Sequence, residues 1–254
     1  MKTISVHSYK GGTGKTTFLL NLAGYLAKEG KRTLALDYDM RAPSFQSYFK
    51  VKNPVFISDY LLQNKSISEL IYPCRVDSDF HLDLMFSSME FLKQHSKQRD
   101  QLSRDDSKYL SKMFELQREV SKNYDYLMID TIPGFFYRSI DAMMISNVII
   151  VIANPSTSNI LGIEELSSNI YSLLSKETKM ILLINKIEEE GMQSDKKIFE
   201  ENLSKLRKIG GEKFSSCIEV PFFSMLSERI YAFEKETNKE FDEMISRLAN
   251  MIRD

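Results

Sequence analysis

The sequence has only two cysteines, Cys74 and Cys217, which lie far apart and belong to no CxxC pair or Cys/His cluster. Structural zinc sites, iron–sulfur ligation and disulfide frameworks are therefore excluded as leading interpretations, and a reduced, cytoplasmic setting fits best. Long apolar runs are also missing, because no stretch approaches the ~18 to 20 apolar residues that a membrane span requires. The first residues, MKTISVHSYKGG, have too short an apolar run for a signal peptide, so we expect a soluble chain.

A surplus of either charge is absent as well, since 34 Lys and Arg residues balance 35 Asp and Glu residues. No global electrostatic bias indicates a nucleic acid or an acidic membrane as a partner, and any such binding has to be local. Internal repeats and low-complexity runs are also lacking. At 254 residues the chain suits one large domain with a sizeable core, and we expect residues 1–254 to form a single domain.

Short apolar runs recur along the chain, and several are apolar throughout, as strands buried on both faces of a parallel sheet are. The runs lie at 3–8, 33–37, 82–86, 126–130, 148–154 and 180–185. Helical periodicity occurs between them, at 16–30, near 105–121, at 159–174 and at 195–208. This alternation predicts an α/β fold with a doubly wound, mostly parallel sheet and helices on both faces. An α/β barrel is the alternative, but eight strand–helix units are not visible.

A glycine-rich loop, HSYKGGTGKTT, follows the first apolar run and precedes the first helical pattern. The strict phosphate-loop pattern requires glycine where this chain has Tyr9, yet the order of strand, loop and helix is the required one. Glycines let successive backbone N–H groups turn towards phosphate oxygens, and the helix N-terminus adds partial positive charge. The residues expected to bind the phosphates are Gly11, Gly12, Thr13, Gly14, Lys15, Thr16 and Thr17. The alternative is a glycine-rich turn that binds no ligand.

Within this loop, each polar side chain has an expected role. Lys15 would contact the β and γ phosphates, Thr16 would offer its hydroxyl to Mg²⁺, and Thr17 would reach the α phosphate.

Carboxylates follow two of the predicted strands at the ends where a doubly wound sheet binds ligands. TLALDYD ends in Asp37 and Asp39, and YLMID ends in Asp130. We expect Asp130 to hold the Mg²⁺ shell, Asp39 to position or activate the attacking water, and Asp37 to pair with a lysine of the loop. Taken alone, each aspartate would be interpreted as a helix cap or a solvated turn residue. Their occurrence together with the loop favours a metal–phosphate site.

These motifs together resemble those of the MinD/ParA family of ATPases. The deviant phosphate loop of that family, K-G-G-x-G-K-[ST], is matched by residues 10–16 and tolerates a residue such as Tyr9 before it. The D-x-D motif matches LALDYD, and D-T-P-P-G matches residues 130–134 with Ile132 as the one replacement. The resemblance runs from residue 1 to about residue 235. It implies a P-loop NTPase fold, ATP and Mg²⁺ as cofactors, and slow hydrolysis of ATP to ADP and phosphate.

The resemblance also implies roles for residues outside the motifs. Asn185, in LLINK, stands where family members carry an Asn that binds the adenine edge, and Pro221 and Phe222 stand where the backbone lines the base. A turn residue is the alternative for Asn185. Lys10 would reach across an ATP-dependent homodimer to the partner's nucleotide, as an arginine finger does. The predicted catalytic residues are therefore Lys10, Lys15 and Asp39, and a solvated surface charge is the alternative for Lys10.

Two segments are candidate surfaces for the membrane or DNA binding known among members of the family. The tail has an apolar stripe formed by Phe241, Met244, Ile245, Leu248, Met251 and Ile252. Its polar face is mainly acidic, the wrong sign for anionic lipid, so we expect a helix packed on the domain. Clustered cations occur at Lys93, Lys97, Arg99 and Arg104, and at Lys196, Lys197, Lys205, Arg207 and Lys208. Interleaved acids favour solvated faces, although non-specific DNA binding stays open, as does a protein activator or adaptor.

Three other classes share this loop or this core. DYDMRAP resembles the D-x-D-x-R pattern of bacterial tyrosine kinases, but no tyrosine cluster follows Tyr231. Iron–sulfur carrier ATPases use a cysteine pair across the dimer, which the two separated cysteines do not match. A non-catalytic adaptor that binds ATP as a structural ligand also stays open. The favoured interpretation is an ATPase that switches between monomer and ATP-bound dimer to position or partition a cellular cargo.

Overall fold

The computed structural model describes residues 1–63, 65–74, 80–89, 102–171, 174–187, 196–223 and 238–253. The elements are β1 (Lys2–His7), α1 (Lys15–Lys28), β2 (Thr33–Asp37), α2 (Phe45–Tyr48), α3 (Ile57–Gln63), the 3-10 helix η1 (Ile67–Leu70), β3 (Tyr72–Cys74), β4 (Leu82–Met85), α5 (Leu102–Val120), β5 (Tyr126–Asp130), α6 (Tyr137–Met144), β6 (Val148–Ala153), α7 (Thr157–Asn169), β7 (Lys179–Ile187), α8 (Lys196–Lys213), β8 (Ser216–Pro221) and α9 (Lys239–Arg253).

The strands form one sheet in the order β3-β4-β2-β5-β1-β6-β7-β8. Every neighbouring pair is parallel except β3 and β4, which are antiparallel. The chain leaves β1 towards β2 on one side and later returns to β6 on the other, which makes β1 the switch point of a doubly wound sheet. The predicted α/β class with a mostly parallel sheet is therefore confirmed.

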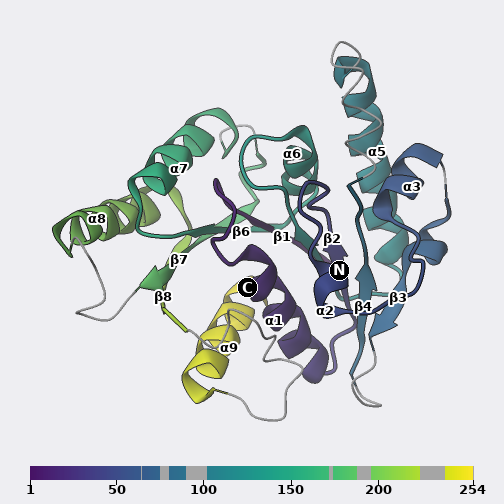
Figure 1. Cartoon of the computed structure of the whole chain (residues 1–254), viewed down its shortest axis with the longest axis horizontal. Helices are drawn as coiled ribbons and strands as arrows, with labels where there is room; N and C mark the ends of the chain where they lie inside the picture. Colours follow the sequence, from purple (N-terminus) through teal and green to yellow (C-terminus); the bar gives the residue numbers. More distant parts are fainter. Residues whose placement is uncertain are drawn as a thin grey trace.

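Helices cover both faces of this sheet (Figure 1). One buried cluster joins α1, α2 and α9 to one face, and two further clusters join α3, α5 and α6, and α7 and α8, to the opposite face. Strand β2 shows how the sequence produces this arrangement, since Ala35 belongs to the first cluster while Leu34 and Leu36 belong to the second. Successive side chains of a strand point to opposite faces, so an uninterrupted apolar run is what a doubly covered sheet requires.

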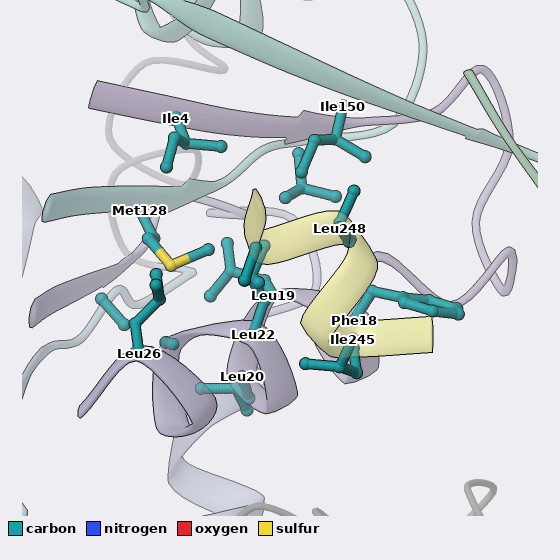
Figure 2. Close-up of a cluster of buried hydrophobic side chains, with 14 of the residues drawn as sticks. Ile4, Phe18, Leu19, Leu20, Leu22, Leu26, Met128, Ile150, Ile245 and Leu248 are labelled. Carbon is teal, nitrogen blue, oxygen red and sulfur yellow. The ribbon is translucent and has the colours of Figure 1, made fainter. Parts of the chain in front are cut away.

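The tail helix α9 packs against α1 under the sheet, as the tail sequence predicts (Figure 2). Phe241, Ile245 and Leu248 are buried, and the rings of Phe18 and Phe241 lie 6.2 Å apart. The acidic face of α9 is left towards solvent. Among the described residues, no helix combines the length and the apolarity that crossing a bilayer requires.

Several elements are present that the apolar runs and the helical periodicity do not predict, among them β3, β8 and α6. β3 is a three-residue edge strand that contains Pro73 and pairs antiparallel with β4. β8 is the opposite edge, and only alternate residues of it, Ile218 and Val220, are buried. The helix α6 carries a buried ion pair between Arg138 and Asp141, with 2.9 Å between guanidinium nitrogen and carboxylate oxygen. Edge strands and helices with buried charge lack the continuous apolar patterns from which strands and helices are predicted.

Candidate nucleotide site

The glycine loop between β1 and α1 has backbone conformations that side chains would not permit. Gly12 and Gly14 have φ values of 74° and 104°, in the left-handed region that favours glycine. A Cβ on Gly14 would lie 2.7 Å from the amide nitrogen of Asn185, so no side chain fits there. Gly14 is also the N-cap of α1, and its carbonyl accepts the N–H of Phe18 at 2.9 Å. The loop therefore presents the N-terminus of a long helix, which is a binding site for anions.

A cavity of about 340 Å³ lies at this helix N-terminus. Its lining residues are Gly12, Gly14, Lys15, Thr16, Thr17, Phe18, Ser44, Tyr48, Asn185, Lys186, Phe222 and Phe223. The structure thus brings most of the predicted phosphate loop together with Asn185 and Phe222, which are far away in sequence. Gly11, Thr13 and Pro221 adjoin the lining residues in sequence but do not line the cavity. Ser44, Tyr48, Lys186 and Phe223 are lining residues to which the sequence analysis gave no role.

Thr16 and Asp130 meet below the loop, where the Thr16 hydroxyl donates a hydrogen bond to Oδ2 of Asp130. Asp130 is 1% exposed, and its Oδ1 has no hydrogen-bond partner among the described residues. Burial, opposed by the charge of Lys15 and the Thr16 hydrogen bond and supported by nearby Asp39, raises the pKa of Asp130 to about 6. A hydroxyl beside a buried carboxylate with a free oxygen is the oxygen-rich donor set that Mg²⁺ prefers. These residues therefore fit a magnesium ion bound together with phosphate.

Asp37 has a different environment from the one expected. It is 1% exposed, and its carboxylate accepts the backbone N–H groups of Ser44 (2.8 Å), Phe45 (3.1 Å) and Asp39 (3.1 Å). The expected pairing with a loop lysine is not seen within the described part of the chain. The reason is geometric, since both carboxylate oxygens are used by the turn after β2. Burial, with a contribution from Asp130, raises the pKa of Asp37 to about 7.

Asp39 stands at the beginning of this turn and is 6% exposed. Its Oδ1 accepts the backbone N–H groups of Arg41 (3.1 Å) and Ala42 (3.0 Å). Its carbonyl accepts the hydroxyl of Ser87 at 3.3 Å. The carboxylate is therefore fixed by its own loop, close enough to Asp130 to affect the pKa of that residue.

Asn185 and Lys186, at the end of β7, hold the outer side of the loop. The amide nitrogen of Asn185 donates to the carbonyl of Thr13 at 2.7 Å, and the ammonium of Lys186 donates to the carbonyl of Gly12 at 2.9 Å. Two loop carbonyls are thus paired with side chains of β7. Lys186 has a φ of 60°, a strained value for a residue with a side chain. In this structure the Asn185 amide nitrogen contacts the loop, whereas the resemblance implied contact with adenine.

The two predicted lysines of the loop lie in different environments. Lys15 is 7% exposed at the first position of α1, whereas Lys10 is exposed at the start of the loop. The backbone at Lys10 is fixed, because its carbonyl accepts the Ser8 hydroxyl at 2.6 Å. Lys15 therefore lies at the cavity and Lys10 at the surface.

A buried histidine lies at the base of the loop and was not identified from sequence. His7 is fully buried, and its Nδ1 lies 2.8 Å from the hydroxyl of Thr131. That hydroxyl donates to the carbonyl of Val6 at 2.9 Å, so it accepts from His7, and Nδ1 carries the proton. Burial and the charge of Lys15 lower the pKa of His7 to about 3. A neutral imidazole thus joins the ends of β1 and β5.

The predicted cationic clusters have mixed outcomes. The cluster at 93–99 lies outside the described residues, as does the side chain of Arg104. On α8, Arg207 is held by Glu219 through two contacts of 2.6 and 2.8 Å, and Lys208 lies 3.9 Å from Glu212. Its lysines are exposed among acids, which is a mixed surface. Within the described ranges, no group of three His, Cys, Asp or Glu residues is arranged to hold a metal ion.

Comparison with known proteins gives consistent results. Residues 1–184 match the family model described as an AAA domain. A ParA family protein of Chlamydia pneumoniae is 29% identical over 188 residues, which are 72% of this chain and 70% of that protein. Across four curated relatives, the chain spans between 42% and 70% of the relative's length.

Solved structures show the same fold. A putative plasmid partition protein from Borrelia burgdorferi bound to AMPPNP has a TM-score of 0.70 and 20% identity to this chain. The alignment covers 99% of this chain and 97% of the partition protein. The septum site-determining protein MinD from Pyrococcus horikoshii, complexed with Mg-ADP, has a TM-score of 0.68 and 18% identity to this chain. The alignment covers 99% of this chain and 95% of MinD. At these identities the likeness establishes a shared fold and nothing finer.

Proposed function

Because the chain belongs to the MinD/ParA-type P-loop ATPases, we propose that it binds Mg-ATP and hydrolyses it slowly while it switches between a monomer and an ATP-bound homodimer. The proposal treats residues 1–254 as one ATPase domain. The observation that carries it is the cavity at the N-terminus of α1, with the Thr16–Asp130 pair beside it.

Each end of the nucleotide has a matching part of the site. The phosphates fit the N–H groups of residues 11–17 and the ammonium of Lys15, because helix N-termini and cations both attract anions. Mg²⁺, when bound, would neutralise phosphate charge, and Thr16 and Asp130 would hold it. Among the other lining residues, the exposed Phe222 offers an apolar surface for the base.

Two residues outside the cavity lining supply the proposed chemistry. Asp39 orients or activates the attacking water, and its carboxylate is already fixed by the N–H groups of its own turn. Lys10 reaches the nucleotide of a partner copy, where a cation stabilises the negative charge that develops on transferred phosphate. The exposure of Lys10 and the burial of Lys15 support this division between a trans and a cis lysine.

The cycle would position or partition a cellular cargo, a role supported by the likeness to a plasmid partition protein and to a septum site-determining protein. A protein activator or adaptor is the expected partner. The exposed lysines of α8 form the surface through which the protein would bind DNA without sequence preference. Membrane binding is disfavoured, because the apolar face of α9 is buried against the domain.

Three substitutions test this function with purified protein and radiolabelled or fluorescent ATP. Lys15→Ala is expected to weaken ATP binding by about tenfold to a hundredfold, because it removes a charge-assisted contact. Lys10→Ala is expected to keep ATP binding but lose the dimer and about 10³-fold in turnover, as removal of an arginine finger does. Asp39→Ala is expected to bind ATP and to accumulate as dimer, measured by size-exclusion chromatography with ATP.

Lys52→Ala, at an exposed lysine outside the cavity, is the control for loss of a positive charge. An Asp39→Ala protein that stays monomeric with ATP contradicts the dimer switch. Equal loss of ATP binding in Lys10→Ala and Lys15→Ala would show that Lys10 acts within its own subunit. Wild-type turnover in Asp39→Ala would contradict the role of Asp39 in hydrolysis, and absence of turnover in the wild-type protein would favour the non-catalytic adaptor.

A further inference from the structure

The residue before Lys10 fits into a notch in a helix. Tyr9 is half-buried, and its ring lies on the backbone of α7 at Gly162. A Cβ added to Gly162 would lie 2.0, 2.1 and 2.4 Å from three atoms of the Tyr9 ring. Real Cβ atoms do not approach other atoms so closely, so the contact exists only because residue 162 is glycine.

Further contacts hold the same short segment from other sides. The ring of Phe135 meets the Tyr9 ring edge-on, with 6.0 Å between centroids and 80° between planes. The N–H of Gly134 donates to the carbonyl of Ser8 at 2.8 Å. The Ser8 hydroxyl, in turn, donates to the carbonyl of Lys10 at 2.6 Å. The backbone before Tyr9 is therefore fixed to the loop after β5, the Ser8 hydroxyl holds the Lys10 carbonyl that follows Tyr9, and the Tyr9 ring is fixed to α7.

The side chain of Lys10 lacks such contacts. Its ammonium makes no hydrogen bond or ion pair within the part of the chain that the structure describes, and the residue is exposed. A long, solvated lysine loses much conformational freedom when it binds at a fixed point, and a rigid attachment of its backbone lowers that cost. Contacts within this chain therefore fix the backbone of Lys10 but not its side chain.

We propose that Tyr9 is a positioning residue for Lys10, and that Gly162 is the receptor on α7 that makes this positioning possible. This inference rests on the proposed function, because it assumes that Lys10 acts in a partner's site. Tyr9 occupies the place where a strict phosphate loop has its first glycine, and its ring points to α7 instead of to the phosphates. A tyrosine in place of that glycine therefore attaches the start of the loop to α7, and its ring does not fill the cavity.

The pairing of a large ring with a missing side chain gives a direct test. Gly162→Ala introduces a Cβ that displaces the Tyr9 ring, although alanine is itself a better helix former than glycine. We expect ATP affinity within about threefold of wild type, because the residues that line the cavity are unchanged. ATP-dependent dimer formation and turnover should fall about tenfold to a hundredfold, since a shift of about 1 Å in a catalytic group has such effects.

Gly211→Ala is the matched control, because Gly211 is also helical, on α8, and a Cβ there meets nothing within 4 Å. It should behave as wild type. Tyr9→Ala should reproduce the effect of Gly162→Ala, and Tyr9→Phe should restore turnover, because the Tyr9 hydroxyl has no hydrogen bond to the described residues. In the Tyr9→Ala/Gly162→Ala double variant, the second change should add little, because the ring that it displaces is already absent.

The outcomes separate this inference from the proposed function when Lys10→Ala is measured in parallel. Loss of turnover in Lys10→Ala, with wild-type turnover in Tyr9→Ala and Gly162→Ala, overturns the positioning role alone. Wild-type turnover in Lys10→Ala overturns both, because a lysine without a role needs no positioning. Additive losses in the double variant, or loss of ATP affinity equal to the loss of turnover, would show that the two residues only support the loop.

Discussion

His7 illustrates how a single buried residue connects the loop to the rest of the sheet. Its imidazole is neutral, donates through Nδ1 to Thr131, and leaves Nε2 without a partner among the described residues. A buried histidine with a lowered pKa makes the free energy of unfolding depend on pH. The unfolded chain binds a proton at pH values where the folded chain keeps the imidazole neutral.

A pH series therefore tests the state of His7. The folded pKa of about 3 lies below the ordinary value of 6.5, so the unfolded chain binds more protons between these values and stability falls as pH falls. We expect the unfolding free energy of wild type, relative to His7→Asn, to fall by about 1.4 kcal/mol per pH unit between pH 6 and pH 4. Urea unfolding at several pH values measures it.

The comparison with His7→Asn cancels two carboxyl groups that act in the opposite direction. Asp37 and Asp130 have raised pKa values, so the folded chain holds their protons more tightly and their contribution to stability rises as pH falls. Both groups are present in both proteins. Parallel stability curves for the two proteins would mean that His7 accepts a proton in the folded state.

The residue-level site was predictable where it depends on local sequence. The glycines and the acids after β2 and β5 follow each other in short motifs, so their position at one edge of the sheet could be inferred. The contact between Asn185 and Thr13 joins residues 172 positions apart, and that of Tyr9 with Gly162 joins α7 to the loop. Such contacts depend on how helices and strands are packed, for which a single sequence contains no local signal.

At the scale of elements, α9 is held to the molecule by its apolar face and by its end. Lys2 of β1 donates to the carbonyls of Ile252 and Arg253, and Lys179 of β7 donates to the carbonyl of Met251 at 2.9 Å. These lysines satisfy carbonyls that the last turn of a helix leaves unpaired, and their charge suits the negative end of the helix dipole.

We expect Leu248→Ala to destabilise the protein by about 2–5 kcal/mol, because Leu248 is fully buried between α1 and the sheet and its truncation leaves a cavity (Figure 2). Glu243→Ala, at an exposed position of the same helix, is the control and should change the unfolding free energy by no more than about 0.5 kcal/mol. Urea unfolding compares the two. A cost near zero for Leu248→Ala would mean that α9 is undocked in solution.

Elements were predictable to the extent that they are buried on both faces. β2, β5 and β6 are fully buried and coincide with apolar runs to within one residue. β3 and β8 lie at the edges of the sheet, where one side of a strand has no neighbour and continuous apolarity is unnecessary. The short helix α2 depends on Asp37, whose carboxylate accepts the N–H of Phe45, and a four-residue helix has no detectable period.

At the scale of the whole molecule, the charges are balanced and the apolar stripe of the tail helix α9 is packed against α1 and the sheet. We expect the ATP-bound Asp39→Ala protein to stay in the supernatant when it is centrifuged with anionic liposomes, because the apolar stripe of α9 is already buried. A parallel sedimentation with plain DNA tests the lysines of α8, whose binding would weaken with added salt.

Sedimentation of the Asp39→Ala protein with liposomes would contradict the docked arrangement of α9. If Leu248→Ala increased that sedimentation, the helix would bind the membrane when it is released from the domain. Binding to neither liposomes nor DNA would favour a role in which only proteins are contacted.

The bond from Lys2 to the carbonyl of Ile252, at 3.0 Å, joins positions 250 residues apart and brings the two ends of the chain side by side (Figure 1). They meet at the N-terminal edge of β1, whereas the glycine loop extends from the opposite edge. A fluorescent protein fused at either end would therefore sit away from the nucleotide cavity and from Lys10. A short linker engineered between residues 1 and 254 would close this domain into a circle, so that new ends could be opened in an exposed turn such as the one at Gly30.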